Sequence, residues 1–101
     1  MKYVITESRL ENFIFNWLEN EYGDLKKFKH PSYEEVFLER NGMFKMAYIS
    51  RSKRLYVKNE IWDFVRDMFS LDNEETGELF TKWGNNKFGF RAKLAHRVEE
   101  I

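Results

Sequence analysis

Few side chains in this 101-residue sequence have a type and spacing that could perform acid–base or metal chemistry. The histidines, His30 in a polar stretch and His96 in a basic one, lack the further ligands that a metal site requires. We expect His30 in a solvated loop and His96 at the surface or against a phosphate. Asp63 and Asp67 lie one helical turn apart, as in a hydrolase pair, but charge runs on helices are usually solvated faces. With His30 they support only a third hypothesis, a small hydrolase.

The sequence contains none of the motifs that accompany common catalytic sites. It has no Gly-x-Ser-x-Gly, no phosphate-binding loop, no dinucleotide-binding glycine pattern and no His-Glu-x-x-His. Cysteine is absent, which excludes disulfides, thiolate metal sites and a cysteine nucleophile. We therefore predict that the protein is not an enzyme and that it has no cofactor and no metal ion.

Cationic and aromatic residues interleave in residues 82–97, a pattern that can stack bases and neutralise phosphates. Acidic residues concentrate instead in residues 60–78. The candidate nucleic-acid contacts are Arg51, Lys53, Arg54, Lys87, Arg91, Lys93 and Arg97. The competing interpretation is that the aromatic residues form core beneath solubilising Lys and Arg. Seventeen basic and seventeen acidic residues cancel, which is atypical of dedicated nucleic-acid binders, so nucleic-acid binding is the second hypothesis.

Composition indicates one folded domain over residues 1–101, because 43% of the residues are hydrophobic and 18% aromatic. No run approaches the ~20 apolar residues of a membrane span. The apolar stretch after Met1 is too short for the centre of a signal peptide. We expect a cytoplasmic protein that has no contact with a membrane.

The first element that the sequence predicts is an amphipathic helix over 7–22. Its apolar residues recur at helical spacing: Leu10, Phe13, Ile14, Trp17 and Leu18. Residues 24–34, which contain the single proline, predict a loop or at most one helical turn.

A hairpin is expected next, because Asn41-Gly42 separates two β-prone runs, residues 35–40 and 43–49, and supplies the positive φ angles of a type I′ turn. A two-residue loop places Phe37 opposite Met46. Phe37, Phe44, Met46 and Tyr48 would then share one face, and Val36, Leu38, Ala47 and Ile49 the other. Residues 55–57 add a third strand and complete an antiparallel meander.

Two further helices are predicted at about 59–69 and from Asp72 through Trp83, the second ended by residues 84–86. The inner face of the first would carry Ile61, Val65, Met68 and Phe69. Alternating apolar residues favour a strand near 88–93, while Leu94, Ala95, Val98 and Ile101 also fit a helix. The expected fold is α+β, with an N-terminal amphipathic helix, a three-stranded antiparallel meander, two further helices and a C-terminal strand.

The opening Met-Lys-Tyr-Val-Ile-Thr-Glu-Ser-Arg-Leu, which runs straight into a helix, resembles the start of many short uncharacterised proteins of tailed bacteriophages, marine ones especially. The resemblance is specific over about ten residues. It implies a phage origin, in the host cytoplasm or in the virion, and it implies no activity and no functional residue.

These patterns favour a non-enzymatic protein-interaction module, either a minor virion component or a regulator of a host protein. Phe15, Tyr56 and Trp62 fall outside the inward faces assigned above, and exposed aromatics favour protein interfaces. They are the candidate interaction surface, for a protein partner or for self-association.

Overall fold

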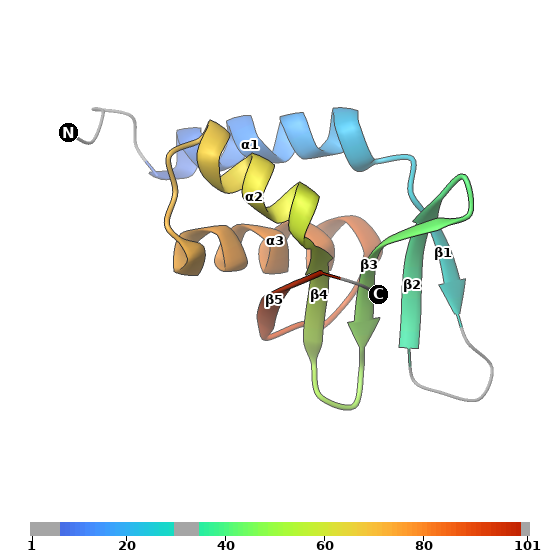
Figure 1. Ribbon diagram of the computed structural model, residues 1–101. Coiled ribbons are helices and arrows are strands. Elements are labelled where there is room, and N and C mark those ends of the chain that lie inside the picture. The colour runs from blue at the N-terminus through green and yellow to red at the C-terminus, as the bar shows by residue number, and fades with distance from the viewer. Residues whose placement is uncertain (1–6, 30–34, 100–101) are drawn as a thin grey trace.

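The computed structural model describes residues 7–29 and 35–99; residues 1–6, 30–34 and 100–101, and with them His30, lie outside the described residues. In chain order the elements are α1 (Glu7–Tyr22), β1 (Lys26–Lys29), β2 (Glu35–Arg40), β3 (Met43–Ile49), β4 (Arg54–Lys58), α2 (Asn59–Met68), α3 (Asn73–Phe88) and β5 (Leu94–Val98). Within this part of the chain, α2 and α3 lie against one face of a five-stranded mixed sheet, and α1 packs on α3 (Figure 1).

The strands lie in the sheet in the order in which they occur in the chain. β1 to β4 form an antiparallel meander, whereas β5 pairs in parallel with β4 after the chain has passed through α2 and α3. A parallel pair requires such a crossover, because a hairpin can join only antiparallel strands. The α+β class, the amphipathic first helix and the two later helices are as predicted, but the sheet is larger than the expected three-stranded meander.

The predicted hairpin forms over the expected residues, and its turn has φ of 53° at Asn41 and 78° at Gly42. The predicted register is wrong beyond the turn, because the pairing shifts between Leu38 and Glu39. Leu38 therefore pairs with Met46. The shift moves Met46 and Tyr48 to the face opposite Phe37, so that part of the predicted grouping is wrong, whereas Phe37 and Phe44 share a face as predicted.

The prediction of a loop over residues 24–34 is wrong for its first part, because Lys26–Lys29 forms β1 and pairs antiparallel with β2. Three lysines in four residues give little local preference for a strand. The strand therefore depends on a tertiary contact, the backbone pairing offered by β2.

The end of α3 also differs from the prediction. Residues 84–86 do not end the helix, which continues to Phe88 and is capped by Gly89 with φ of 73°. Gly84 lies inside the helix because a Cβ there would approach the Leu55 side chain to 3.1 Å, so the glycine permits close packing on the sheet. The predicted strand at 88–93 is displaced: the strand is β5, at Leu94–Val98.

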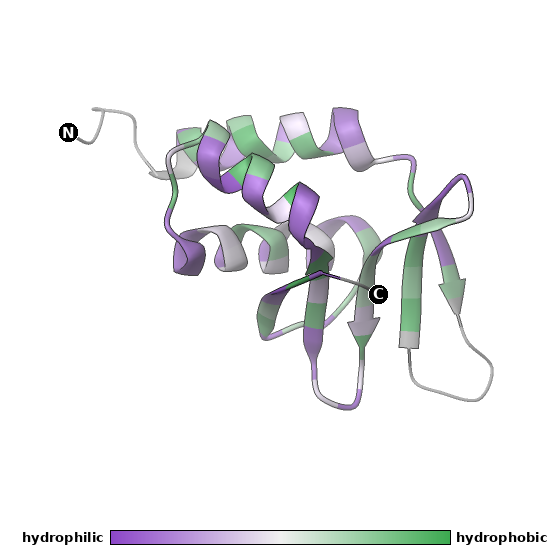
Figure 2. Cartoon of the chain, in the orientation of Figure 1, coloured by the Kyte–Doolittle hydropathy of each residue, from purple (hydrophilic) through white to green (hydrophobic). Residues whose placement is uncertain are grey.

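The core lies between the helices and one face of the sheet. Hydrophilic and hydrophobic stretches alternate along α2 (Figure 2), as expected for an element with one buried side. Fully buried side chains come from both layers: Ile14, Leu18, Leu38, Met46, Leu55, Val57, Val65 and Phe80.

Candidate interaction surfaces

The structure separates the three residues predicted to form an interaction surface. Trp62 is 3% exposed, stacks on Phe80 at 5.6 Å and donates from Nε1 to Asn73 at 3.2 Å. Its assignment to a surface is therefore wrong, because α3 covers the flank of α2 that a single helix would leave open. Phe15 is half-buried against the core, and Tyr56 is half-buried on the opposite side of the sheet.

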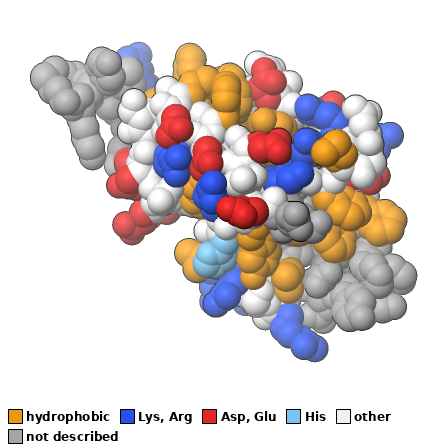
Figure 3. Space-filling view, in the orientation of Figure 1, with side chains coloured by type: hydrophobic (Ala, Val, Ile, Leu, Met, Phe, Trp, Pro, Cys, Tyr) orange, Lys and Arg blue, Asp and Glu red, His pale blue; other side chains and the backbone are white. Residues whose placement is uncertain are grey.

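Exposed aromatic and methionine side chains gather instead where α1 meets α2. We define the α1–α2 patch as Phe13, Trp17, Phe64, Met68 and Phe69. Hydrophobic side chains reach the surface on this side of the molecule (Figure 3, upper edge). Phe13 is 65% exposed, Phe64 52% and Met68 43%.

Ring contacts join the α1–α2 patch into one surface. The indole of Trp17 stacks on Phe64, with centroids 5.4 Å apart and planes 17° apart. Phe69 meets both Trp17 and Phe13 edge to face at 6.0 Å. Aromatic pairs in these geometries contribute beyond their buried area, so the rings are fixed in place although their outer faces meet water.

Sequence reasoning placed Phe13 and Met68 on inward stripes, so it missed this patch. The helical period is correct, but the apolar stripe of α1 is wider than the surface that the rest of the fold covers. The available signal was the summed width of the apolar stripes on α1 and α2, which exceeds what one small core can bury.

The other side of the sheet forms a second surface, which we call the open face because no helix among the described residues covers it. Backbone pairing sets one residue of each strand directly opposite the next: Phe28, Phe37, Ala47, Tyr56 and His96. Residues paired in this way lie on the same face, so four aromatic rings form a row across the sheet.

The row contains two ring clusters on either side of the small Ala47. Tyr56 and His96 stack at 5.7 Å, with planes 27° apart. Phe37 stacks at 4.8 Å on Phe44, a neighbour on the same face, and Phe28 lies 6.4 Å from Phe44. The pale blue side chain in Figure 3, which is that of the described histidine, lies among hydrophobic side chains with Lys and Arg below them.

Five of the seven predicted nucleic-acid contacts lie at one end of the sheet. Arg51, Lys53 and Arg54 belong to the β3–β4 turn and the start of β4, while Arg91 and Lys93 precede β5. A backbone hydrogen bond of 2.8 Å from the Lys93 N–H to the Lys53 carbonyl joins the two segments. All five side chains are exposed.

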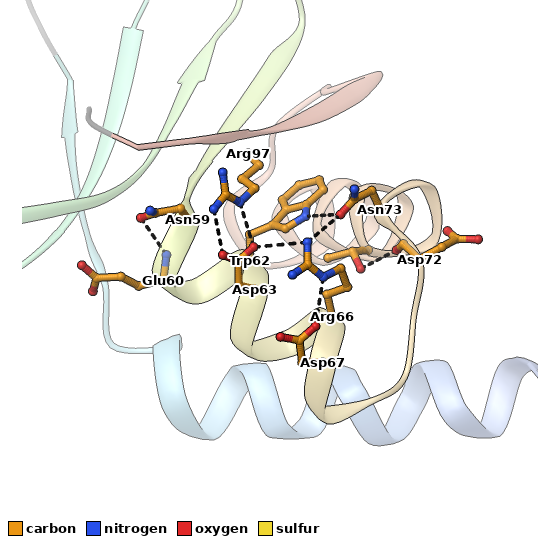
Figure 4. A network of polar contacts seen from close by, with 10 residues as sticks. Asn59, Glu60, Trp62, Asp63, Arg66, Asp67, Asp72, Asn73 and Arg97 are labelled. Carbon is orange, nitrogen blue, oxygen red and sulfur yellow. Dashed lines mark hydrogen bonds and ion pairs between the residues drawn. The ribbon is translucent and has the colours of Figure 1, made fainter.

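The other two predicted contacts point to the helical layer, where they pair with acids. Arg97 donates to both carboxylate oxygens of Asp63 at 2.7 and 2.8 Å (Figure 4). Lys87 forms an ion pair with Glu19. These hydrogen bonds from Arg97 hold the pKa of the Asp63 carboxyl below its usual value, against a smaller opposing effect of desolvation.

The carboxylate pair of the hydrolase hypothesis is also engaged in ion pairs. Arg66 lies 3.4 Å from Asp63 and 3.0 Å from Asp67, so each acid has a cationic partner. Among the described residues, no group of three or more His, Asp or Glu side chains is arranged to hold a metal ion. The arrangement serves to join α2 to β5 and α3.

None of the described helices is long and apolar enough to cross a bilayer. The comparisons with known proteins give no relative: no family model matches the chain, and no curated protein or solved structure matches it significantly.

Proposed function

We propose that the protein is a non-enzymatic interaction module that docks onto a partner protein through the α1–α2 patch. The observation that carries this proposal is the exposed stack of Trp17 and Phe64, continued by Phe13, Met68 and Phe69. A contiguous, ordered apolar surface of this kind is typical of protein interaction sites.

Phe13 and Phe64 are the side chains that docking would remove from water. Their exposed fractions together equal slightly more than one whole Phe side chain left in water. Burying one such side chain contributes roughly 2 kcal/mol, or about thirtyfold in affinity. The rings are already ordered by their neighbours, so binding would cost little side-chain entropy.

The nature of the partner follows from the patch and from the resemblance to phage proteins. An aromatic and methionine surface fits an apolar patch or groove on another protein. A phage origin favours a structural protein of the virion or a host protein that the phage redirects. Self-association would bury the same rings and is an outcome of the test below.

The test compares a Phe13→Ser/Phe64→Ser variant with a Phe28→Ser variant, because Phe28 is similarly exposed, at 47%, but lies on the open face. Tagged proteins capture partners from nuclease-treated lysate of infected cells, and mass spectrometry identifies what co-purifies. We expect one defined protein to be lost with the double variant and retained with Phe28→Ser. Purified, it should bind the double variant about thirtyfold more weakly.

Sedimentation of the wild-type protein and the double variant measures self-association. A dimer that the double variant abolishes would make a second copy the partner. A partner that the double variant retains, in a protein that melts like the wild type, would refute docking through the α1–α2 patch.

A further inference from the structure

We propose that the open face of the sheet binds single-stranded nucleic acid, with bases stacked on its aromatic row and phosphates held by cations around it. The site lies on the side of the sheet opposite the helices and is separate from the α1–α2 patch. It replaces the predicted set of nucleic-acid contacts by one that includes the rings of Phe28, Phe37, Tyr56 and His96.

The aromatic row has the geometry of a stacking platform. Its rings come from β1, β2, β4 and β5, and at the central strand the row has the small Ala47 in place of a ring. Phe37 and Tyr56 are therefore two strand spacings apart, or about 10 Å. Side chains project from the same side of a twisted but continuous sheet, so bases on both clusters could belong to one extended strand.

Cations surround the row on the open face. Lys26, Arg54 and Lys58 each lie two residues from an aromatic member of the row on the same strand, and therefore on the same face. Arg51, Lys53, Arg91 and Lys93 lie beyond the end of the sheet, next to Arg54. Among the side chains that the structure describes, which do not include those of Glu7 and Glu35, no carboxylate lies within ion-pair distance of these seven.

In the helical layer, by contrast, cations pair with acids. Its cations Arg66, Lys82 and Lys87 each pair with an acid, and so does Arg97 of β5, which points toward α2. The acidic stretch 60–78 lies in α2, α3 and their connection. A net charge of zero therefore conceals an uneven distribution, in which the described cations of the open face have no described acid beside them.

Charge complementarity identifies the occupant. A protein interface is depleted in lysine, whereas phosphates require unpaired cations. Flat aromatic rings between those cations match unpaired bases, whose faces are hidden inside a duplex. Glu39 pairs with Phe44 on the β1 side of the open face. Its carboxylate would repel a phosphate there, so the nucleic-acid backbone would lie closer to Arg54.

The experiment measures fluorescence anisotropy of labelled 12-nucleotide single strands of DNA and RNA, and of a duplex of equal length. The wild-type protein should bind the single strands at low salt and the duplex at least tenfold more weakly. A preference between the two single strands would report a contact to the ribose 2′-hydroxyl.

Three variants separate stacking from charge. Phe28→Ala and Tyr56→Ala should each weaken binding about 5- to 100-fold, and Phe28 is exposed at an edge, so its removal leaves the core intact. Lys58→Ala should lower the salt slope by about one. Lys82→Ala, which removes a paired cation of the helical layer, should change neither.

Equal affinity for duplex and single strands, or unchanged affinity in Phe28→Ala and Tyr56→Ala, would overturn the proposal. The binding would then be non-specific electrostatic attraction to a polyanion. Absence of binding at 50 mM salt would overturn it outright. Phe13→Ser/Phe64→Ser should bind nucleic acid normally, so failure of this site and failure of the α1–α2 patch are distinguishable.

Discussion

Asn85 connects the last turns of α3 to the segment that leads into β5. Its side-chain amide donates to the Ala92 carbonyl at 3.0 Å, and its carbonyl oxygen accepts from the Ala92 N–H at 2.9 Å. Ala92 is buried, so Asn85→Ala removes two hydrogen bonds and leaves two backbone groups without partners and shielded from water.

The magnitude follows from opposing contributions. Removing one partner of a buried backbone group costs about 1 to 3 kcal/mol, which already includes the lost hydrogen bond, so the two groups together cost about 2 to 6 kcal/mol. The higher helix propensity of alanine returns about 0.6 kcal/mol, and local rearrangement admits some water. We expect Asn85→Ala to lower the free energy of unfolding by about 2 kcal/mol, and Tm by about 8 to 16 °C.

Urea unfolding followed by tryptophan fluorescence measures this change. The matched control is Asn86→Ala, because Asn86 is exposed and has no side-chain hydrogen bond among the described residues. Asn86→Ala should be neutral or slightly stabilising. If Asn85→Ala falls within about 0.5 kcal/mol of Asn86→Ala, the paired hydrogen bonds do not hold this connection and the reasoning is refuted.

Two further predictions concern polar contacts of the helical layer. Arg97 lowers the pKa of Asp63 below 3.8, so Asp63 stabilises the fold above that pH and loses this contribution as pH falls through its folded value. Asp63→Asn should therefore be less stable than wild type at pH 7, with the difference shrinking at pH 3; an equal difference at both would contradict the ion pair. Asp72→Ala, which removes the capping box that Asp72 forms with Glu75, should cost about 1 kcal/mol in urea, whereas Glu74→Ala should cost far less.

The sequence predicted correctly those elements whose conformation is set by residues adjacent in the chain. Asn41-Gly42 requires only its own φ angles, and the hairpin formed over the expected residues. The shift between Leu38 and Glu39 has no comparable signal, because either register leaves apolar residues on both faces of β2 and β3. For that reason the prediction assigned the β3 residues beyond the shift to the wrong face relative to β2.

The surfaces were harder to predict than the elements, because they depend on how layers cover one another. Trp62 lies at the edge of the apolar stripe of α2 and is buried only because Gly77 lets α3 approach its ring, with a Cβ at that glycine coming to 3.2 Å. Phe13 lies within the stripe of α1 and is exposed because none of the described elements covers it. Both are aromatic residues on amphipathic helices, and their burial is decided by which neighbouring element packs against them.

The lysines of β1 have a consequence for behaviour at high concentration. Among the described strands, β1 and β5 are the edges of the sheet, where backbone groups are free to pair with another chain. A second molecule that added its own β1 to this edge would bring lysines directly opposite lysines, within about 5.5 Å. The three lysines of β1, which gave no local signal of a strand, therefore oppose edge-to-edge polymerisation. A four-residue edge strand of Val and Ile would favour it.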